Sequence, residues 1–289
     1  MSSKSWEDSS TRETEPRRPR APSTACWLGI NGDSLIRSSG YPMEPVIETS
    51  DLVKIYREGA IKAVDGLNLR IGKGEIYALI GANGSGKTTT INMLTGSLFP
   101  TSGEIRILGL QVPKRRRIVA TEIGVVPQEY ALYGDLTVEQ NIWFFAKLYG
   151  IERSSFLRRL DELLPILRLD ERRKTPVSNL SGGMKRRVSI ACALVHKPKI
   201  VFLDEATVGI DPVLRAFFWQ YFRTLAMTGL TVVLTSHVMD EAERADRIGL
   251  MRAGKLIEEG TPEEIKRKHF ASSIEQVFLR LSGGAVADE

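Results

Sequence analysis

Cysteine and histidine are scarce, since the 289-residue chain has two cysteines and three histidines. Cys26 and Cys192 lie far apart in sequence and lack a metal-ligand spacing, which argues against a disulfide framework or a structural zinc site and fits a reducing compartment. Long apolar runs are missing too, because none approaches the roughly 20 residues that span a bilayer. The N-terminus lacks the apolar core of a secretory signal. We therefore expect a cytosolic chain that does not cross a membrane by itself.

A strong charge of either sign is also missing. The chain has 40 Lys and Arg against 35 Asp and Glu, a formal net charge of +5. This excess permits attraction to phosphates or to an anionic membrane surface, but it requires neither. A hydrophobic content of 42% and a charged content of 26% are typical of a globular protein.

Residues 1–42 show no apolar periodicity and are rich in Ser, Pro, Arg and Glu. Such a segment cannot bury enough surface to offset the entropy that it would lose on ordering, so we predict a disordered tail. Its six basic and five acidic residues argue against a basic nucleic-acid arm. The folded domain is predicted over residues 43–289. A further hypothesis is that translation begins at Met43, which N-terminal sequencing of the native protein would test.

The stretch Gly81–Thr88 reads GANGSGKT and matches the phosphate-binding pattern GxxxxGK[ST] at every fixed position. The apolar run Ile76–Ile80 before it predicts a buried parallel strand, and Thr89–Thr95 after it predicts a helix that ends at Gly96. A flexible Gly/Ser turn is the alternative. The strand, the loop and the helix nevertheless stand in the order that phosphate binding requires. The sequence therefore predicts binding of a nucleoside triphosphate.

Individual residues of this region have expected roles. Lys87 should reach the β- and γ-phosphates, and Thr88 should offer its hydroxyl to Mg²⁺. Tyr56 lies near the end of a predicted strand upstream of the loop; alone it would be a core residue, but beside a nucleotide we favour stacking on adenine. The other expected nucleotide contacts lie in the loop or directly follow it: Gly81, Asn83, Gly84, Ser85, Gly86 and Thr89.

Two further apolar strands are followed by polar residues that suit a phosphate site. The predicted strand 123–128 ends in Gln128, a candidate to sense the γ-phosphate or its metal. Asp204 and Glu205 follow the apolar residues 200–203. Asp204 suits Mg²⁺, and Glu205 is placed to polarise an attacking water.

Another apolar strand, over residues 231–237, ends in His237. The other two histidines, His196 and His269, have basic neighbours in sequence, which predicts that they are exposed. Because ligands bind at the carboxyl ends of strands in open parallel α/β sheets, the polar residues that end these strands are expected to meet.

Residues 137–195 predict a helical insertion in the α/β chain. Thr137 is the expected cap of its first helix, and Pro165 should bend or interrupt the second. The third helix opens with Ser181-Gly182-Gly183, and a Ser-Gly-Gly sequence at a helix start favours a second anion-binding site. A later helix carries an aromatic set that we assign to the core: Phe217, Phe218, Trp219 and Phe222.

Taken together, these motifs resemble the ATP-binding subunit of an ABC transporter, over about residues 45–282. The specific part is a Ser-Gly-Gly sequence that lies between a phosphate loop and an Asp-Glu strand. The resemblance implies an α/β fold with a P-loop NTPase core, a mainly parallel sheet, an N-terminal antiparallel β-subdomain and the helical insertion. It also implies an ATPase with ATP and Mg²⁺ as cofactors.

The resemblance further implies a head-to-tail homodimer with two ATP molecules at its interface. Each phosphate loop would face Ser181, Gly182 and Gly183 of the other copy, whose helix N-terminus would help to neutralise the phosphates. In this arrangement Thr88, Gln128 and Asp204 hold the metal. The implied catalytic residues are Lys87 on the phosphates, Gln128 on the metal and water, Glu205 as general base and His237 on the γ-phosphate. Asp211 would belong to a loop that communicates between the two sites.

One residue departs from the family pattern, and the domain content limits what the chain can do without a partner. Met184 stands where many members have Gln, so a polar contact from that position is lost, although the backbone donors of Gly182 and Gly183 remain. The chain has one nucleotide domain and no membrane span, so the transport path must lie on a separate permease chain. Peripheral attachment to the inner face of the membrane follows from this. Ser273–Leu281 resembles the closing helix of type-2 exporters, the group that exports drugs, lipids or polysaccharides.

Export is the leading hypothesis. A permease helix would dock near Gln128 and the helical insertion, and exposure of Tyr130, Tyr133 or Trp143 would support this. The alternative is a soluble ABC ATPase that acts on nucleic acid or ribosomes; we expect no nucleic-acid partner, because the chain has no long heptad run and only one nucleotide domain. A regulator that does not hydrolyse ATP would be expected to lack Glu205 or His237, and both are present.

Overall fold

The computed structural model describes residues 45–56, 61–206 and 210–282. All of them belong to one compact unit, residues 43–289. The predicted tail over residues 1–42 and the hypothetical start at Met43 lie outside the described residues.

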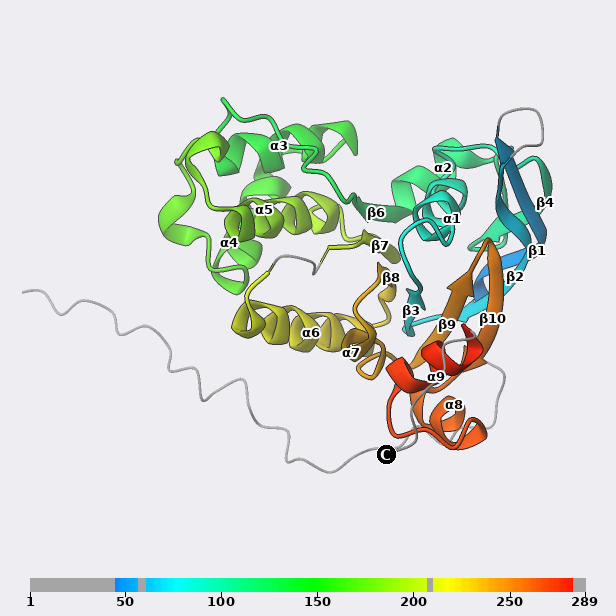
Figure 1. The fold of residues 1–289 in the computed structure, drawn as a ribbon. Helices are drawn as coiled ribbons and strands as arrows, with labels where there is room; N and C mark the ends of the chain where they lie inside the picture. The colour runs from blue at the N-terminus through cyan, green and yellow to red at the C-terminus, as the bar shows by residue number, and fades with distance from the viewer. Residues whose placement is uncertain (1–44, 57–60, 207–209, 283–289) are drawn as a thin grey trace, which may run out of the picture. The chain divides into compact units, whose positions relative to one another are not determined.

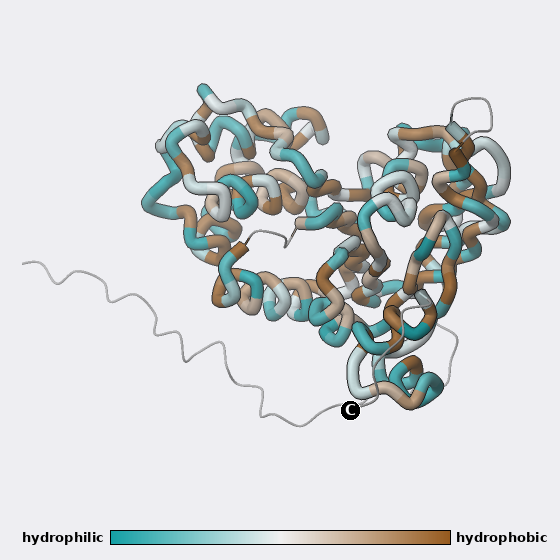
Figure 2. Tube along the Cα trace, viewed as in Figure 1, coloured by the Kyte–Doolittle hydropathy of each residue, from teal (hydrophilic) through white to brown (hydrophobic). Residues whose placement is uncertain are grey.

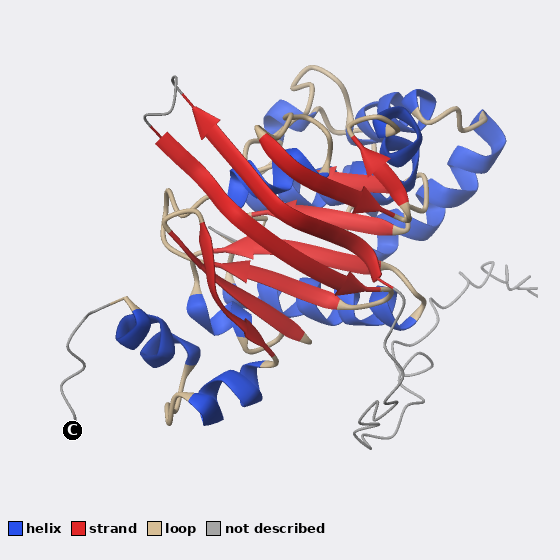
Figure 3. Cartoon of the chain, turned by 90° about the vertical axis from the view of Figure 1, so that its right-hand side faces the viewer, coloured by secondary structure: helices blue, strands red, loops and turns tan. Residues whose placement is uncertain are grey.

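Ten strands form two sheets in the described part of the chain (Figure 3). The strands are β1 (Pro45–Tyr56), β2 (Ile61–Gly72), β3 (Ile76–Ile80), β4 (Ser102–Ile107), β5 (Leu110–Val112), β6 (Ile123–Val126), β7 (Ile200–Asp204), β8 (Thr231–Ser236), β9 (Arg247–Arg252) and β10 (Lys255–Gly260). The smaller sheet has the order β2-β1-β4-β5, and its neighbouring strands are all antiparallel. This confirms the predicted N-terminal antiparallel subdomain.

The larger sheet has the order β10-β9-β3-β8-β7-β6. Its strands are parallel except for β10, which pairs with β9 in an antiparallel hairpin. Strands β3, β7 and β8 are buried along their whole length, as strands covered on both faces must be. The expected mainly parallel sheet is therefore confirmed, although β9 had not been predicted as a strand. Because β3, β6, β7 and β8 run in one direction, the residues that follow them gather at one edge of the sheet.

Helices cover the sheets and form a separate group between β6 and β7 (Figure 1). The helices are α1 (Lys87–Leu94), α2 (Arg116–Glu122), α3 (Val138–Leu148), α4 (Arg153–Ile166), α5 (Gly182–Leu194), α6 (Pro212–Met227), α7 (Met239–Ala242), α8 (Pro262–Lys268) and α9 (Ile274–Leu281), with 3-10 turns at Asp170–Arg172 and Val177–Asn179. Thr137 caps α3 as predicted, in a reciprocal capping box with Gln140. Pro165 lies inside α4, which ends one residue later. No helix of the described residues is long and apolar enough to cross a membrane.

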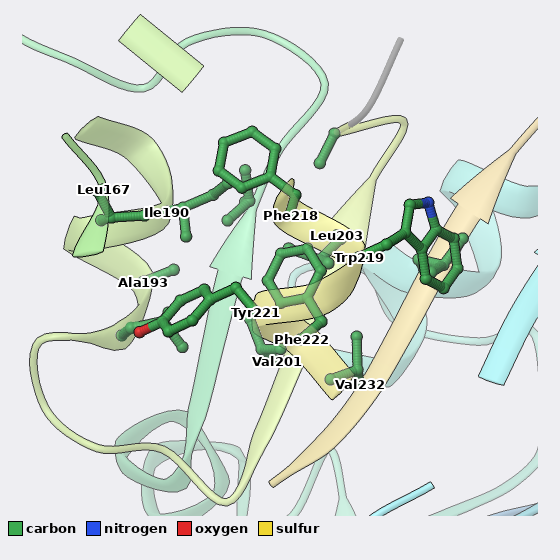
Figure 4. Packing of buried hydrophobic residues seen from close by; sticks show 14 of the residues in the cluster. Leu167, Ile190, Ala193, Val201, Leu203, Phe218, Trp219, Tyr221, Phe222 and Val232 are labelled. Atoms are coloured by element: carbon green, nitrogen blue, oxygen red, sulfur yellow. The ribbon is translucent and has the colours of Figure 1, made fainter. Parts of the chain in front are cut away.

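The core between α6, α5 and the parallel sheet is rich in aromatic side chains (Figure 4). Phe218, Trp219 and Phe222 of α6 are buried, and Phe217 packs partly buried against the same cluster. Hydrophobic and hydrophilic residues both occur along the helices (Figure 2), as expected for helices with one buried and one exposed face. The predicted core role of this aromatic set is confirmed.

The two histidines that were expected at the surface are partly buried instead. The His196 ring stacks on Tyr149 with centroids 3.6 Å apart, and its Nε2 lies 3.0 Å from the carbonyl oxygen of Ile123. His269 Nε2 lies 2.6 Å from Glu258 Oε2. The prediction was wrong because basic neighbours in sequence do not show which partners packing brings to a side chain.

Candidate functional site

The phosphate loop joins β3 to α1 and needs glycine at two crowded positions. A Cβ on Gly81 would lie 2.2 Å from the carbonyl oxygen of Met251, and one on Gly86 would lie 2.3 Å from that of Ala63. Gly86 also has a left-handed backbone, with φ of 107°. The fixed glycines therefore let the loop fold tightly between the two sheets and turn directly into α1.

The start of α1 offers donors to an anion. Gly86 caps α1 without any side-chain hydrogen bond, so the first N–H groups of the helix have no side-chain acceptor. The Ser85 hydroxyl is buried and has no hydrogen-bond partner in the described residues. A phosphate oxygen could accept hydrogen bonds from both the N–H groups of α1 and the Ser85 hydroxyl. These donors form a cradle that therefore fits a nucleotide phosphate.

Lys87 is 4% exposed, and its ammonium donates to the carbonyl oxygens of Gly81 and Ala82 at 2.8 and 3.0 Å. Burial lowers the pKa of Lys87, and the nearby Glu205 and Asp204 carboxylates partly oppose that shift. A buried cation next to a cradle of N–H groups attracts a phosphate strongly, because little water screens it.

Asp204 ends β7 and is 4% exposed. Its Oδ1 accepts hydrogen bonds from Thr88 Oγ1 at 3.2 Å and from Thr235 Oγ1 at 2.5 Å. A carboxylate and a hydroxyl side by side are the hard oxygen donors that suit Mg²⁺, whose remaining positions are usually filled by phosphate and water. The described residues hold no group of three or more His, Cys, Asp or Glu side chains that could hold a metal ion by themselves.

Glu205 has a strained backbone and three polar neighbours. Its φ is 47°, a left-handed conformation that costs energy for a residue with a side chain. Its Oε1 lies 3.8 Å from Lys87 Nζ and 3.4 Å from His237 Nδ1, and its Oε2 accepts from Gln128 Nε2 at 3.1 Å. The fold thus brings together the side chains at positions 87, 128, 205 and 237, which come from four different strand ends.

His237 lies at the rim of this group. Its side chain is 37% exposed, and its buried Nδ1 makes no hydrogen bond in the described part of the chain despite its distance of 3.4 Å from Glu205. A ring with one unsatisfied nitrogen, held beside a carboxylate, can turn toward a ligand at the carboxyl ends of β3 and β7.

Arg186 holds the loop after β6 and was not predicted to have a role. The side chain is 5% exposed, and it donates to the carbonyl oxygens of Pro127 and Gln128 at 2.7 and 2.9 Å. It also lies over the ring of Tyr130, whose hydroxyl donates to Gly182 O at 3.1 Å. The start of α5 and the Gln128 loop are therefore fastened to each other.

Thr235 is a second residue without a predicted role. Besides its bond to Asp204, its Oγ1 accepts from the main-chain N–H of Glu205 at 3.1 Å. The parallel pairing of β7 with β8 places Asp204 opposite Thr235, and this pairing is what indicates a role for Thr235. That register cannot be read from either strand alone.

The Ser-Gly-Gly segment opens α5 as expected. Ser181 caps the helix and accepts from the Met184 N–H at 3.3 Å, while Ser181 and Gly182 are exposed. No hydrogen bond or ion pair of the described residues joins this segment to the phosphate loop of the same chain. Asp211 caps α6, where its Oδ1 accepts from the Leu214 N–H at 2.9 Å.

The remaining predicted nucleotide contacts lie at the surface around the loop. Asn83, Gly84 and Thr88 are exposed, and Thr89 is partly exposed. Tyr56 ends β1 with 38% of its surface exposed, and the Lys54 ammonium lies 5.3 Å from the centre of its ring. An exposed aromatic face is free for stacking, and the adenine contact remains a prediction.

Comparison with known proteins places these motifs in one family. A profile described as ABC transporter matches residues 64–208. The chain is 39% identical over 247 residues to the probable multidrug ABC transporter ATP-binding protein YbhF of Escherichia coli, covering 84% of this chain but only 42% of that protein. It is 38% identical over 236 residues to the Nod factor export ATP-binding protein I of Paraburkholderia xenovorans, covering 81% and 77% of the two chains.

Solved structures show the same fold. One is a dimeric, post-hydrolysis ATP-binding cassette bound to ADP and Pi. It is 27% identical to this chain, with a TM-score of 0.70, and the match covers 74% of this chain and 98% of that one.

Proposed function

Because the chain belongs to the ABC transporter family, we propose that it is the ATP-hydrolysing subunit of an exporter. It would dimerise around two ATP molecules and drive a permease carried on a separate chain. The observation that carries the proposal is the Glu205 carboxylate, which contacts Lys87, Gln128 and His237 at the edge of the sheet where β3 delivers the phosphate loop.

Each residue of this group has a role that follows from its contacts. Lys87 and the N–H groups of α1 bind the phosphates and neutralise their charge. Glu205 accepts the proton of the attacking water, and Gln128 orients both that water and the carboxylate. His237 binds the γ-phosphate from the rim of the site. Thr235 holds Asp204 and the main chain of Glu205 in place through one hydroxyl.

Thr88, Gln128 and Asp204 would hold Mg²⁺. When bound, the ion would neutralise charge on the β- and γ-phosphate oxygens. In the described structure Asp204 is already oriented by the hydroxyls of Thr88 and Thr235, so the carboxylate needs little reorganisation to receive a cation.

Two ATP sites at a dimer interface are supported by the exposed helix start at Ser181 and Gly182. An exposed Ser-Gly-Gly start that does not contact its own phosphate loop is available to a second copy. The similar cassette with bound ADP and Pi is dimeric. This arrangement would complete each site with donors from the other subunit.

The permease would dock beside Gln128. Tyr130 and Tyr133 are 44% and 50% exposed, and both follow β6 next to the helical group. Both relatives are named for ABC transport or export, which favours export over action on nucleic acid. The type-2 export group and a peripheral place on the inner face of the membrane remain part of the proposal.

The test is the variant Glu205→Gln, with Glu171→Gln as its control because Glu171 is exposed and has no hydrogen-bond or ion-pair partner in the described residues. The Glu205 variant should lose ATP hydrolysis by about 10²-fold or more while it still binds MgATP and accumulates as a dimer. Phosphate release and size-exclusion chromatography with light scattering measure the two effects. Hydrolysis at the control's rate would contradict the role of Glu205, and a monomer in saturating ATP would contradict the dimer.

A further inference from the structure

A cavity of about 580 Å³ lies at the opposite edge of the large sheet from the nucleotide site. Its lining includes Lys73, Lys199 and Leu230, which precede β3, β7 and β8 respectively, whereas the nucleotide-site residues follow these strands. It also includes residues at the ends of α5 and α6. This volume is within the range of about 300–1,000 Å³ that small-molecule sites occupy.

Six of the described lining residues are apolar, and we call these six the apolar floor of the cavity. Leu194 and Leu230 are buried, and the other apolar lining residues are partly exposed. These residues come from four separate segments of the chain: Val46, Leu108, Leu194 with Pro198, and Leu225 with Leu230. An alkyl chain bound over the floor would remove apolar surface from water, and this removal favours binding.

Among the described residues that line the cavity, four are cationic and none is acidic. Arg159 donates to Leu194 O and pairs with Glu162 at 2.9 Å, and Lys199 pairs with Glu122 at 3.0 Å. Lys73 and Lys197 make no ion pair or side-chain hydrogen bond in the described residues. Lys73 and Lys197 are thus available for a ligand, although the charge of Lys197 also interacts with the nearby Glu162 carboxylate.

The carboxyl ends of α5 and α6 explain why cations gather here, but not why apolar residues line the cavity beside them. Cations near a helix C-terminus offset its partial negative charge, which accounts for Lys197 and Lys199 beyond α5. Lys73, in the turn between β2 and β3, has its Cε close to Gly229 just beyond α6, so its charge offsets that helix end in the same way. The apolar lining residues have no such explanation. Lys197 also has a left-handed backbone with φ of 54°, where glycine would be less strained.

We propose that this cavity binds a single-chain amphiphile with an anionic head group, either an alkyl carboxylate or an alkyl phosphate. The head group pairs with Lys73 and Lys197, and the alkyl chain covers the floor next to Leu194 and Leu230. Leu194 is the last residue of α5, the helix that begins with the Ser-Gly-Gly segment, so a bound amphiphile contacts the far end of that helix.

The test measures binding of decanoate and decyl phosphate to the full chain by isothermal titration calorimetry, below the concentration at which each probe forms micelles. The variant Lys73→Glu/Lys197→Glu should bind both probes at least about tenfold more weakly than wild type. Lys174→Glu is the matched control, because Lys174 is exposed, unpaired in the described structure and does not line the cavity. Whichever probe binds more tightly identifies the head group.

Two further measurements separate this site from adventitious binding. Decyltrimethylammonium, acetate and inorganic phosphate should each bind at least about tenfold more weakly than the better probe, since the site needs both a negative head and an alkyl chain. Thr228→Phe, at an exposed residue of the lining, should block binding without any change of charge. Equal binding of the cationic amphiphile, or full binding by both cavity variants, would overturn the proposal.

Discussion

The guanidinium of Arg186 donates to the carbonyl oxygen of Gln128 at 2.9 Å. Its other terminal nitrogen donates to Pro127 O at 2.7 Å, and the side chain is buried. One residue of α5 therefore sets the position of the loop that places Gln128 against Glu205. Any movement of α5 relative to the sheet would be transmitted directly to that loop.

Replacing Arg186 by Met should release this loop. Two carbonyl groups would lose their donor, so the free energy of unfolding should fall by about 1–3 kcal/mol. ATP turnover should fall as well, because Gln128 is no longer held beside Glu205. Urea unfolding and steady-state phosphate release measure the two effects. Arg187→Met is the control, since the bonds from Arg187 to Leu167 O and Arg168 O are long, at 3.5 and 3.4 Å. Equal effects of the two variants would contradict the specific role of Arg186.

Replacing Lys87 by Ala should weaken MgATP binding by at least about tenfold, because a buried, charge-assisted contact to phosphate is lost. Equilibrium titration with a fluorescent ATP analogue measures this. The fold should survive, since the hydrogen bonds of Lys87 go to two loop carbonyls and its other close partner, Glu205, also contacts Gln128. Lys174→Ala should leave affinity unchanged. An unaltered affinity in the Lys87 variant would exclude its contact with phosphate.

Thr235 and Thr231 offer a matched pair on β8. Thr235→Val removes the hydroxyl that bonds Asp204 and the Glu205 main chain, and we expect hydrolysis to fall about tenfold. Thr231→Val removes a hydroxyl that bonds Gly74 N–H and Gly72 O at the other end of the strand. It should lower stability by about 1–3 kcal/mol and spare the rate per folded molecule. The same loss of rate in both variants would show that the effect comes from β8 as a whole.

The Glu139 carboxylate should make stability depend on pH. Its oxygens lie 2.7 Å from Arg173 Nε and 2.8 Å from Arg153 Nη2, and the hydrogen bond from Arg173 lowers the pKa of Glu139 below its ordinary value. A lowered folded-state pKa stabilises the fold at pH values above the unfolded pKa of about 4.3. This stabilisation disappears as the pH falls through the folded-state pKa.

We therefore expect Glu139→Gln to lower the free energy of unfolding by about 1 kcal/mol at pH 7, and the two proteins to converge in acid. Urea unfolding over a series of pH values measures the difference between them. A constant difference from pH 7 down to the acid limit would show that Glu139 acts through packing and not through its charge. Glu171→Gln should show no difference at any pH.

The order of strands, loop and helix at the nucleotide site could be predicted from sequence because each signal is local. The glycines of Gly81–Thr88 and the buried run of β3 lie within a dozen residues of each other. Gln128, Asp204 and His237 could likewise be placed at strand ends, and a parallel sheet brings strand ends together whatever the details of packing. The sequence by itself thus determined the fold class and predicted which of these residues lie at neighbouring strand ends.

Only the tertiary structure decided which atoms meet. Thr235 contacts Asp204 because of the register between β7 and β8, and Arg186 reaches Gln128 because α5 packs across the end of β6. The same holds for the stacking of His196 on Tyr149 and for the cations that converge on the cavity from residues 73, 159 and 197. These partners are far apart in sequence, so their pairing depends on how whole elements pack and not on any local propensity.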